Sequence, residues 1–199
     1  MIVGLIGGIG AGKSTIARLL VELGAEVVDA DALAHEILET PEVKEVLVSW
    51  LGKEVLRKDG RVDRKEVAQR VFTSPEEVKK LEALVHPGVR SRIETKILEH
   101  SQQSKKAERH SLLVLDVPLL DGSPLRERCS GVLFVDSPQE TRKKRVEARG
   151  WKAGELERRE KLQTSLEEKK RLSDWVVDNS GTLEETRRQV KDLCELWKE

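Results

Sequence analysis

The chain lacks the features of membrane and exported proteins. None of its apolar runs approaches the ~20 residues of a membrane-spanning helix, and its 199 residues have a mean hydropathy of −0.47. The N-terminus does not show the basic, apolar and cleavable order of a signal peptide. We therefore expect a cytoplasmic protein without membrane attachment.

Cysteine is scarce, and neither sign of charge is in excess. The two cysteines, Cys129 and Cys194, form no CxxC pair, which excludes a disulfide framework and a cysteine-based zinc site. The 36 Lys and Arg residues balance 36 Asp and Glu residues. Because affinity for a phosphate backbone requires excess positive charge, this balance argues against nucleic-acid binding.

Short apolar runs rich in β-branched residues predict buried strands, with polar segments of helical spacing between them. The predicted strands are Ile2–Ile6, Glu26–Val28, Leu112–Leu115, Val132–Val135 and Trp175–Val177. Helix N-caps are predicted at Asp63, Ser74, Ser137 and Thr182, and one helix, Pro75–Val85, is expected to end before His86-Pro87. Strands that alternate with helices predict a three-layer α/β/α domain around a five-stranded parallel sheet.

Two segments are too long to be simple crossovers between neighbouring strands. The first, at about 33–105, is mostly helical and predicts a lobe beside the sheet. The second, at about 142–171, is highly charged with little apolar stripe, which predicts an exposed helical arm. We interpret residues 1–199 as one domain that carries both insertions.

The most specific motif is the sequence GGIGAGKS at residues 7–14, here called the phosphate loop, which matches GxxxxGK[ST]. It follows the strand Ile2–Ile6 and precedes a helix that opens at Thr15. Its glycines let backbone amides surround a phosphate, Lys13 can reach the β- and γ-phosphates, and Ser14 can ligate Mg²⁺. A plain glycine-rich turn would not require the lysine, the hydroxyl and the helix in this register. The residues expected to bind the nucleotide are Gly8, Gly10, Ala11, Gly12, Lys13, Ser14 and Thr15.

The motifs that are absent restrict the class of nucleotide-binding protein. The chain has no NKxD guanine motif and no LSGGQ transporter motif. Its short length, helical lobe and arginine-rich arm favour a small-molecule kinase, in which the lobe holds the acceptor and the arm closes as a lid over the phosphates. A nucleotide-sensing binding module without transfer chemistry remains an alternative.

Carboxylates follow two predicted strands, at the sheet edge where ligands of parallel sheets bind. Asp29 and Asp31 follow the second strand, and Asp116 follows the third. A carboxylate here can orient an acceptor hydroxyl, and Asp116 has the form of a Mg²⁺-supporting group. For Asp31, the alternative is that it only caps a helix beginning at Ala32.

The arm carries candidate lid arginines. Arg145 and Arg149 lie four residues apart on one helix face, where a mobile guanidinium could neutralise charge on the transferred phosphate. A solvated face paired with glutamates is the alternative. The spacing does not choose between the arginines.

Taken together, these motifs resemble the dephospho-CoA kinase family, and the similarity runs from Val3 to about Val190. The matching segments are Gly4–Thr15, Asp29–Asp31 with Ala34–His35, Arg64, Val71–Phe72, Leu81–Glu82, Val85–Pro87, Pro118–Leu120, Arg159 with Gln163, and Asp174–Asn179. Only the phosphate loop is specific by itself. The order and spacing of the set carry the resemblance.

The resemblance implies a P-loop kinase that transfers the ATP γ-phosphate to the ribose 3′-hydroxyl of dephospho-CoA, with Mg²⁺. Asp31 would face the hydroxyl, Lys13 and the lid residue Arg145 would contact phosphate, and Asn179, the only Asn of the chain, would lie near the adenine. The residues implied at the acceptor are Asp29, Asp31, His86, Pro118, Leu119 and Leu120; those implied at the metal are Ser14 and Asp116.

The family usually continues the Pro-Leu-Leu segment with an apolar residue and Glu, whereas Asp121-Gly122 follows here. Another small-molecule P-loop kinase therefore remains an alternative. We expect ATP and dephospho-CoA as partners, with a monomer or a weak homo-oligomer as the assembly.

Overall fold

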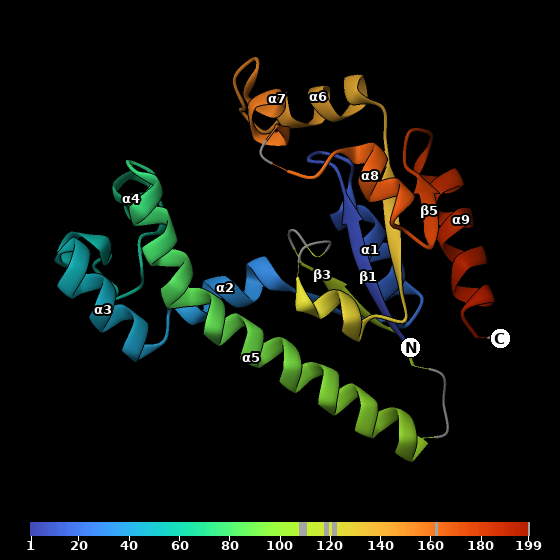
Figure 1. Cartoon of the computed structure of the whole chain (residues 1–199), viewed down its shortest axis with the longest axis horizontal. Coiled ribbons are helices and arrows are strands. Elements are labelled where there is room, and N and C mark those ends of the chain that lie inside the picture. The colour runs from blue at the N-terminus through green and yellow to red at the C-terminus, as the bar shows by residue number, and fades with distance from the viewer. Residues whose placement is uncertain (108–110, 118–119, 121–122, 162, 199) are drawn as a thin grey trace. The chain divides into compact units, whose positions relative to one another are not determined.

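The structure is a computed structural model, which describes residues 1–199 except 108–110, 118–119, 121–122, 162 and 199, and except the side chains of 105–107 (Figure 1). It comprises two compact units. The first contains Met1–Asp29 and His100–Glu199, and the second contains Ala30–Glu99. The residues of the phosphate loop and all five strands belong to the first unit.

A five-stranded parallel sheet organises the first unit, with strand order β2-β3-β1-β4-β5. The strands are β1 (Ile2–Gly7), β2 (Glu26–Asp29), β3 (Leu113–Asp116), β4 (Gly131–Asp136) and β5 (Trp175–Asp178). All five predicted strands are confirmed, with bounds that differ by one residue at most. The alternation of strands with helices also correctly predicted the parallel pairing.

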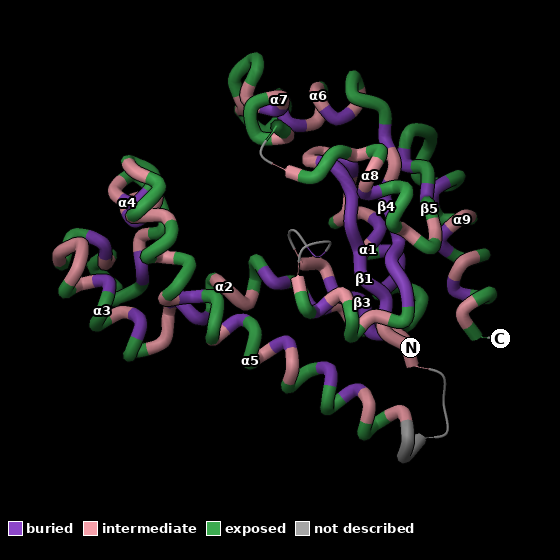
Figure 2. The backbone as a smooth tube through the Cα atoms, viewed as in Figure 1, coloured by how far each residue is buried: buried purple, intermediate pink, exposed green. Residues whose placement is uncertain are grey.

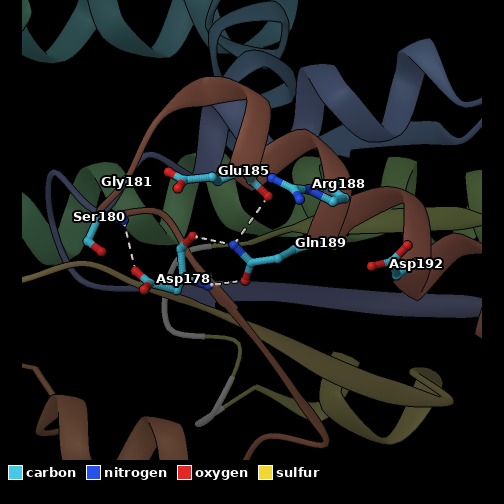
Figure 3. A pocket seen from close by; sticks show the side chains of 7 residues that line it. All are labelled: Asp178, Ser180, Gly181, Glu185, Arg188, Gln189 and Asp192. Carbon is cyan, nitrogen blue, oxygen red and sulfur yellow. Dashed lines mark hydrogen bonds between the residues drawn. The ribbon is translucent and has the colours of Figure 1, made fainter.

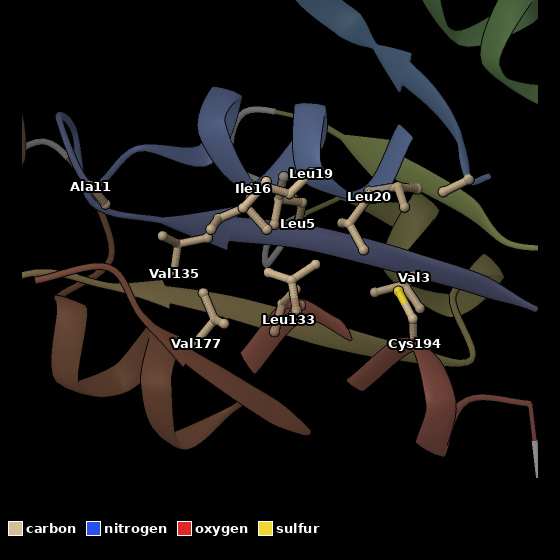
Figure 4. Close-up of a cluster of buried hydrophobic side chains, with 13 residues drawn as sticks. Val3, Leu5, Ala11, Ile16, Leu19, Leu20, Leu133, Val135, Val177 and Cys194 are labelled. Carbon is tan, nitrogen blue, oxygen red and sulfur yellow. The ribbon is translucent and has the colours of Figure 1, made fainter. Parts of the chain in front are cut away.

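The core of this unit lies around the central strand β1, most of which is buried (Figure 2). Val3 and Leu5 of this strand are completely buried. Their side chains join a cluster with α1 (Lys13–Glu22) and α9 (Leu183–Leu196), two helices that contact one another (Figure 4). The opposite face of β1 contacts α8 (Leu166–Arg171). There a Cβ on Gly4 would lie 2.2 Å from the side chain of Leu120, which precedes the short helix η3 (Pro124–Arg128). The sheet is therefore covered on both faces.

The second unit is helical. Its elements are α2 (Ala30–Leu38), α3 (Pro41–Leu51), η1 (Lys53–Val55), α4 (Arg64–Val71) and the larger part of α5 (Pro75–Ala107). The predicted end of a helix at Val85 is wrong, because α5 continues through Pro87. Buried residues continue at four-residue spacing as Val85, Val89, Ile93 and Ile97. This apolar stripe outweighs the one backbone donor that a proline removes.

Three of the four predicted N-caps are confirmed. Asp63 accepts from the amides of residues 65 and 66, Ser74 accepts from residue 77, and Thr182 forms a capping box with Glu185. The prediction for Ser137 is wrong: α6 begins only at Gln139 and ends at Glu147. The Ser137 hydroxyl instead lies 3.3 Å from Nη1 of Arg145. Among the described residues, we find no helix with the length and apolar character needed to cross a membrane.

Replacement of Leu5 by Ala should lower the free energy of unfolding by about 2–5 kcal/mol, because it leaves a cavity in the centre of the sheet. Urea unfolding followed by circular dichroism measures this loss. Leu183→Ala is the control, because that side chain is 47% exposed and its truncation should change stability by less than ~0.5 kcal/mol. Equal losses in the two variants would contradict the assignment of the core.

Candidate active site

The phosphate loop joins β1 to α1 and presents its amides at the start of the helix. Gly10 and Gly12 have φ values of 75° and 98°, in the left-handed region that favours glycine. The amide of Ala11 donates to Gly8 O at 3.1 Å and so closes a turn. Within the part of the chain that the structure describes, the amides of Gly10, Gly12, Lys13 and Ser14 have no acceptor. Such amides at a helix N-terminus form an anion site.

The carbonyls of the loop are held by side chains from elsewhere in the first unit. Arg145 on α6 donates through Nη1 to Ala11 O at 2.9 Å, and the same nitrogen lies 3.3 Å from Gly10 O. The side-chain amide of Asn179 also donates to Ala11 O, at 2.7 Å. In a planar trans peptide the carbonyl and the N–H point in opposite directions. Holding the Ala11 carbonyl from one side therefore directs the Gly12 amide to the other.

Asn179 is buried and connects three elements. It follows β5, its Nδ2 binds the loop, and its Oδ1 accepts from Thr186 Oγ1 of α9 at 3.2 Å. Its backbone carbonyl accepts from Nη2 of Arg145 at 2.9 Å. There is no space for a Cβ on Gly12, because that atom would lie 2.1 Å from Nδ2 of Asn179. The closeness of this packing fixes the loop against β5.

A polar pocket of about 410 Å³ opens beside Asn179, between the end of β5 and α9 (Figure 3). Gln189 holds Asp178 at both backbone groups: its Oε1 accepts from the Asp178 amide and its Nε2 donates to the Asp178 carbonyl, each at 2.9 Å. Hydrogen bonds from Ser180 lower the pKa of the Asp178 carboxyl. The segment that follows β5 therefore has a defined conformation next to the loop.

The carboxylates of the first unit lie side by side at the ends of two strands. Asp29 pairs in register with Asp116, which in turn pairs with Leu5 of β1. Neighbouring residues of parallel strands place their side chains on the same face of a sheet. Asp29 and Asp116 lie at strand ends, as predicted, and the pairing of β2 with β3 makes them neighbours.

The other residues predicted to bind the phosphoryl acceptor are divided between the two units. Asp31 and His86 belong to the second unit, and both side chains are exposed. The alternative interpretation of Asp31 as a cap before Ala32 is wrong, since α2 begins at Ala30 and Asp31 lies within its first turn. Leu120 is completely buried in the first unit. The predictions for Pro118, Leu119 and Asp121-Gly122 lie outside the described residues.

The arm consists of α6, α7 (Glu155–Glu160) and α8, and it is less exposed than predicted. Arg142 and Lys169 are each 4% exposed, and Leu156 is buried. Nζ of Lys169 donates to Gln163 Oε1 at 3.0 Å. The charge density suggested a solvated arm, but these long side chains are buried because oxygen acceptors lie within reach. Arg149, in contrast, is exposed.

The comparisons with known proteins agree with this geometry. The family model for dephospho-CoA kinase matches residues 1–185. The chain belongs to the dephospho-CoA kinase family. It is 38% identical to the dephospho-CoA kinase of Carboxydothermus hydrogenoformans, over 99% of this chain and 94% of that protein.

Two solved structures extend the similarity to the fold of the family. The Thermus thermophilus protein TT1252 superposes with a TM-score of 0.73 and 37% identity, over 98% of this chain and 97% of that one. Dephospho-CoA kinase from Campylobacter jejuni has a TM-score of 0.69 and 26% identity, over 99% and 97% of the two chains. As a member of this kinase family, the chain is an enzyme that uses ATP.

Within this dephospho-CoA kinase fold, sequence reasoning missed the contacts that support the loop from behind. No sequence pattern indicates Thr186, and the sequence marks Arg142 only as a departure from the family, in which Gln is common at this position, without assigning it a contact. One signal was available for Arg142, because it lies three residues before Arg145 and therefore on the same face of α6. The bond between Thr186 and Asn179 joins residues of different elements and has no signature in local spacing.

Gly10→Ala should weaken ATP binding about tenfold or more. A Cβ at this position would lie 2.8 Å from the backbone oxygen of Arg142, and the left-handed φ adds strain, so the loop must shift. Titration calorimetry with ATP measures the effect. Gly24→Ala is a matched control, since Gly24 also has a left-handed φ, of 93°, but a Cβ there would meet nothing within 4 Å. Unchanged ATP affinity in Gly10→Ala would contradict the close packing of the loop.

Proposed function

We propose that this enzyme transfers the γ-phosphate of ATP to the ribose 3′-hydroxyl of dephospho-CoA, which gives CoA and ADP and is the final step of coenzyme A biosynthesis. The observation that carries the proposal is the match to the dephospho-CoA kinase family over residues 1–185, which includes the phosphate loop with its available amides. The reaction requires in-line attack of the hydroxyl on the γ-phosphorus and departure of ADP.

On the nucleotide side, the loop amides and Lys13 bind the phosphates. The hydroxyl of Ser14 is exposed at the first turn of α1, and Asp116 ends the neighbouring strand β3. Oxygen donors of this kind suit Mg²⁺, and Ser14 and Asp116 would hold it. When bound, the ion neutralises charge on the β- and γ-phosphates.

On the acceptor side, Asp31 orients the 3′-hydroxyl and accepts its proton late in the transfer, with Asp29 close to it in sequence. In this proposal His86, Pro118, Leu119 and Leu120 contribute to dephospho-CoA binding. The unit Ala30–Glu99 serves as the acceptor lobe and residues 142–171 serve as the lid.

Arg145 acts through the loop in this proposal. Its guanidinium lies within hydrogen-bond distance of the carbonyls of Gly10, Ala11 and Asn179. These contacts stabilise the loop and do not involve the nucleotide. Arg149 lies in the turn that follows α6, so the prediction that it shares a helix face with Arg145 is wrong. It is exposed, and in this proposal it reaches the phosphates when the lid closes. Asn179 lies next to the adenine but acts mainly by holding Ala11.

The proposal also includes the cellular compartment, the oligomeric state and the partners of the enzyme. We expect it to work in the cytoplasm, as a monomer or a weak homo-oligomer, without nucleic acid or membrane as a partner. The balanced charge of the chain supports this expectation.

Release of ADP from Mg-ATP, with and without dephospho-CoA, tests the function. Adenosine, AMP and CMP serve as competing acceptors. Stimulation by dephospho-CoA alone is expected. Stimulation of ADP release by another acceptor would show that the enzyme is a small-molecule kinase with a different substrate. Tight ATP binding without stimulation by any acceptor would favour a nucleotide-sensing module.

Asp31→Asn should lower kcat about 10²–10⁴-fold and change KM for dephospho-CoA by less than threefold, because the carboxylate acts mainly in the transition state. Steady-state kinetics with both substrates varied separates the two parameters. Asp59→Asn, in the exposed turn between Arg57 and Arg61, should leave both unchanged. Turnover retained in Asp31→Asn would rule out this role.

A further inference from the structure

Arg142 is a buried cation that lies directly against the phosphate loop. Only 4% of its side chain is exposed, which is a costly position for a guanidinium unless oxygen atoms surround it. Nε donates to the Ser137 carbonyl at 3.1 Å, and Nη1 lies 3.4 Å from the Ile9 carbonyl of the loop. The same Nη1 forms an ion pair with Glu160 of α7. One guanidinium therefore links α7, the segment that precedes α6 and the loop.

The loop and Arg142 are also in close steric contact. A Cβ on Gly8 would lie 3.1 Å from Nη1 of Arg142, and a Cβ on Gly10 would lie 2.8 Å from its backbone oxygen. Both glycines therefore allow α6 to approach the loop. Arg142 therefore packs against the loop on both sides of Ile9, the single residue between these glycines.

Peptide geometry gives this contact a direct consequence for nucleotide binding. The Ile9 carbonyl and the Gly10 amide belong to one planar peptide and point in opposite directions. The Gly10 amide is one of those without an acceptor among the described residues. A donor behind the Ile9 carbonyl therefore keeps the Gly10 amide directed at the phosphate position.

We propose that Arg142 is a positioning residue that couples the lid helix α7 to the phosphate loop. Glu160 holds the guanidinium in place, and the guanidinium fixes the peptide between Ile9 and Gly10 for phosphate binding. The proposal deepens the proposed function, since it rests on ATP binding at this loop. It assigns no contact between Arg142 and the nucleotide.

A second carboxylate has to be controlled in the test. Glu157 lies three residues before Glu160 on α7, and one of its oxygens is buried without a hydrogen-bond partner among the described residues. Both glutamates line a pocket of about 350 Å³ that Arg142 also lines. Glu157 is therefore a second carboxylate at the same pocket, and the variant set includes Glu157→Gln together with Glu160→Gln.

The test compares Arg142→Met, which keeps the unbranched stem as far as the Nε position and removes every donor, with Arg142→Lys, which keeps a charged donor beyond that position. Calorimetry measures Kd for ATP, and kinetics measure KM for both substrates. In Arg142→Met, Kd and KM for ATP should rise about tenfold, while KM for dephospho-CoA stays within twofold. Arg142→Lys should recover at least half of the lost affinity on a logarithmic scale. Glu167→Gln, an exposed carboxylate at the rim of the same pocket, is the matched control and should have no effect.

A double-mutant cycle tests the coupling to α7. Glu160→Gln with Glu157→Gln should raise Kd for ATP about three- to tenfold in the wild-type background, and should have no further effect when Arg142 is Met. An effect that persists in the Arg142→Met background would overturn the coupling. ATP affinity within twofold of wild type in Arg142→Met, or KM values for both substrates that rise together, would overturn the positioning role. Because calorimetry needs no acceptor, these outcomes are separate from failure of dephospho-CoA to stimulate ADP release.

Discussion

The carbonyl groups of the phosphate loop are the constraint on which the site depends. A loop that offers several amides to one phosphate must turn the corresponding carbonyls away from it, and buried carbonyls need donors. In this chain the donors are Arg142, Arg145 and the amide of Asn179, from two segments that are distant in sequence. The loop is thus preorganised by its back surface, and the nucleotide does not have to order it on binding.

This arrangement explains why the elements around the loop pack as they do. Asn179 reaches Ala11 because β5 lies at the edge next to β4, and Thr186 of α9 orients the Asn179 amide. Gln189 of the same helix fixes Asp178 one residue earlier. The cluster of buried side chains that includes α1 and α9 also contains Val177 of β5. It therefore holds the strand that precedes Asn179, in addition to stabilising the fold. The arm also contributes donors to the loop carbonyls, through Arg142 and Arg145 of α6.

The sequence predicted the parts of this account that depend on local patterns. Five strands, their parallel pairing, three helix caps and the phosphate loop follow from periodicity, capping chemistry and a specific motif. The placing of Asp29 and Asp116 at one edge of the sheet follows from the rule that parallel strands end at one edge, but their adjacency depends on the strand order, which the sequence did not predict. What local patterns missed depends on packing: the passage of α5 through Pro87, and the burial of Arg142 and Lys169 by acceptors from other elements. The roles of Asp31 and His86 in dephospho-CoA binding stay predictions.

The mobility of the loop in the nucleotide-free enzyme tests the central claim most directly. Backbone ¹⁵N relaxation should give the amides of Gly10, Gly12 and Lys13 order parameters close to those of rigid backbone, about 0.85. In Arg145→Lys, which keeps the charge but not the geometry of the guanidinium, these values should fall towards ~0.6. Arg149→Lys should leave them unchanged. Rigid loop amides in Arg145→Lys would show that the loop does not depend on donors behind its carbonyls, and would contradict the account.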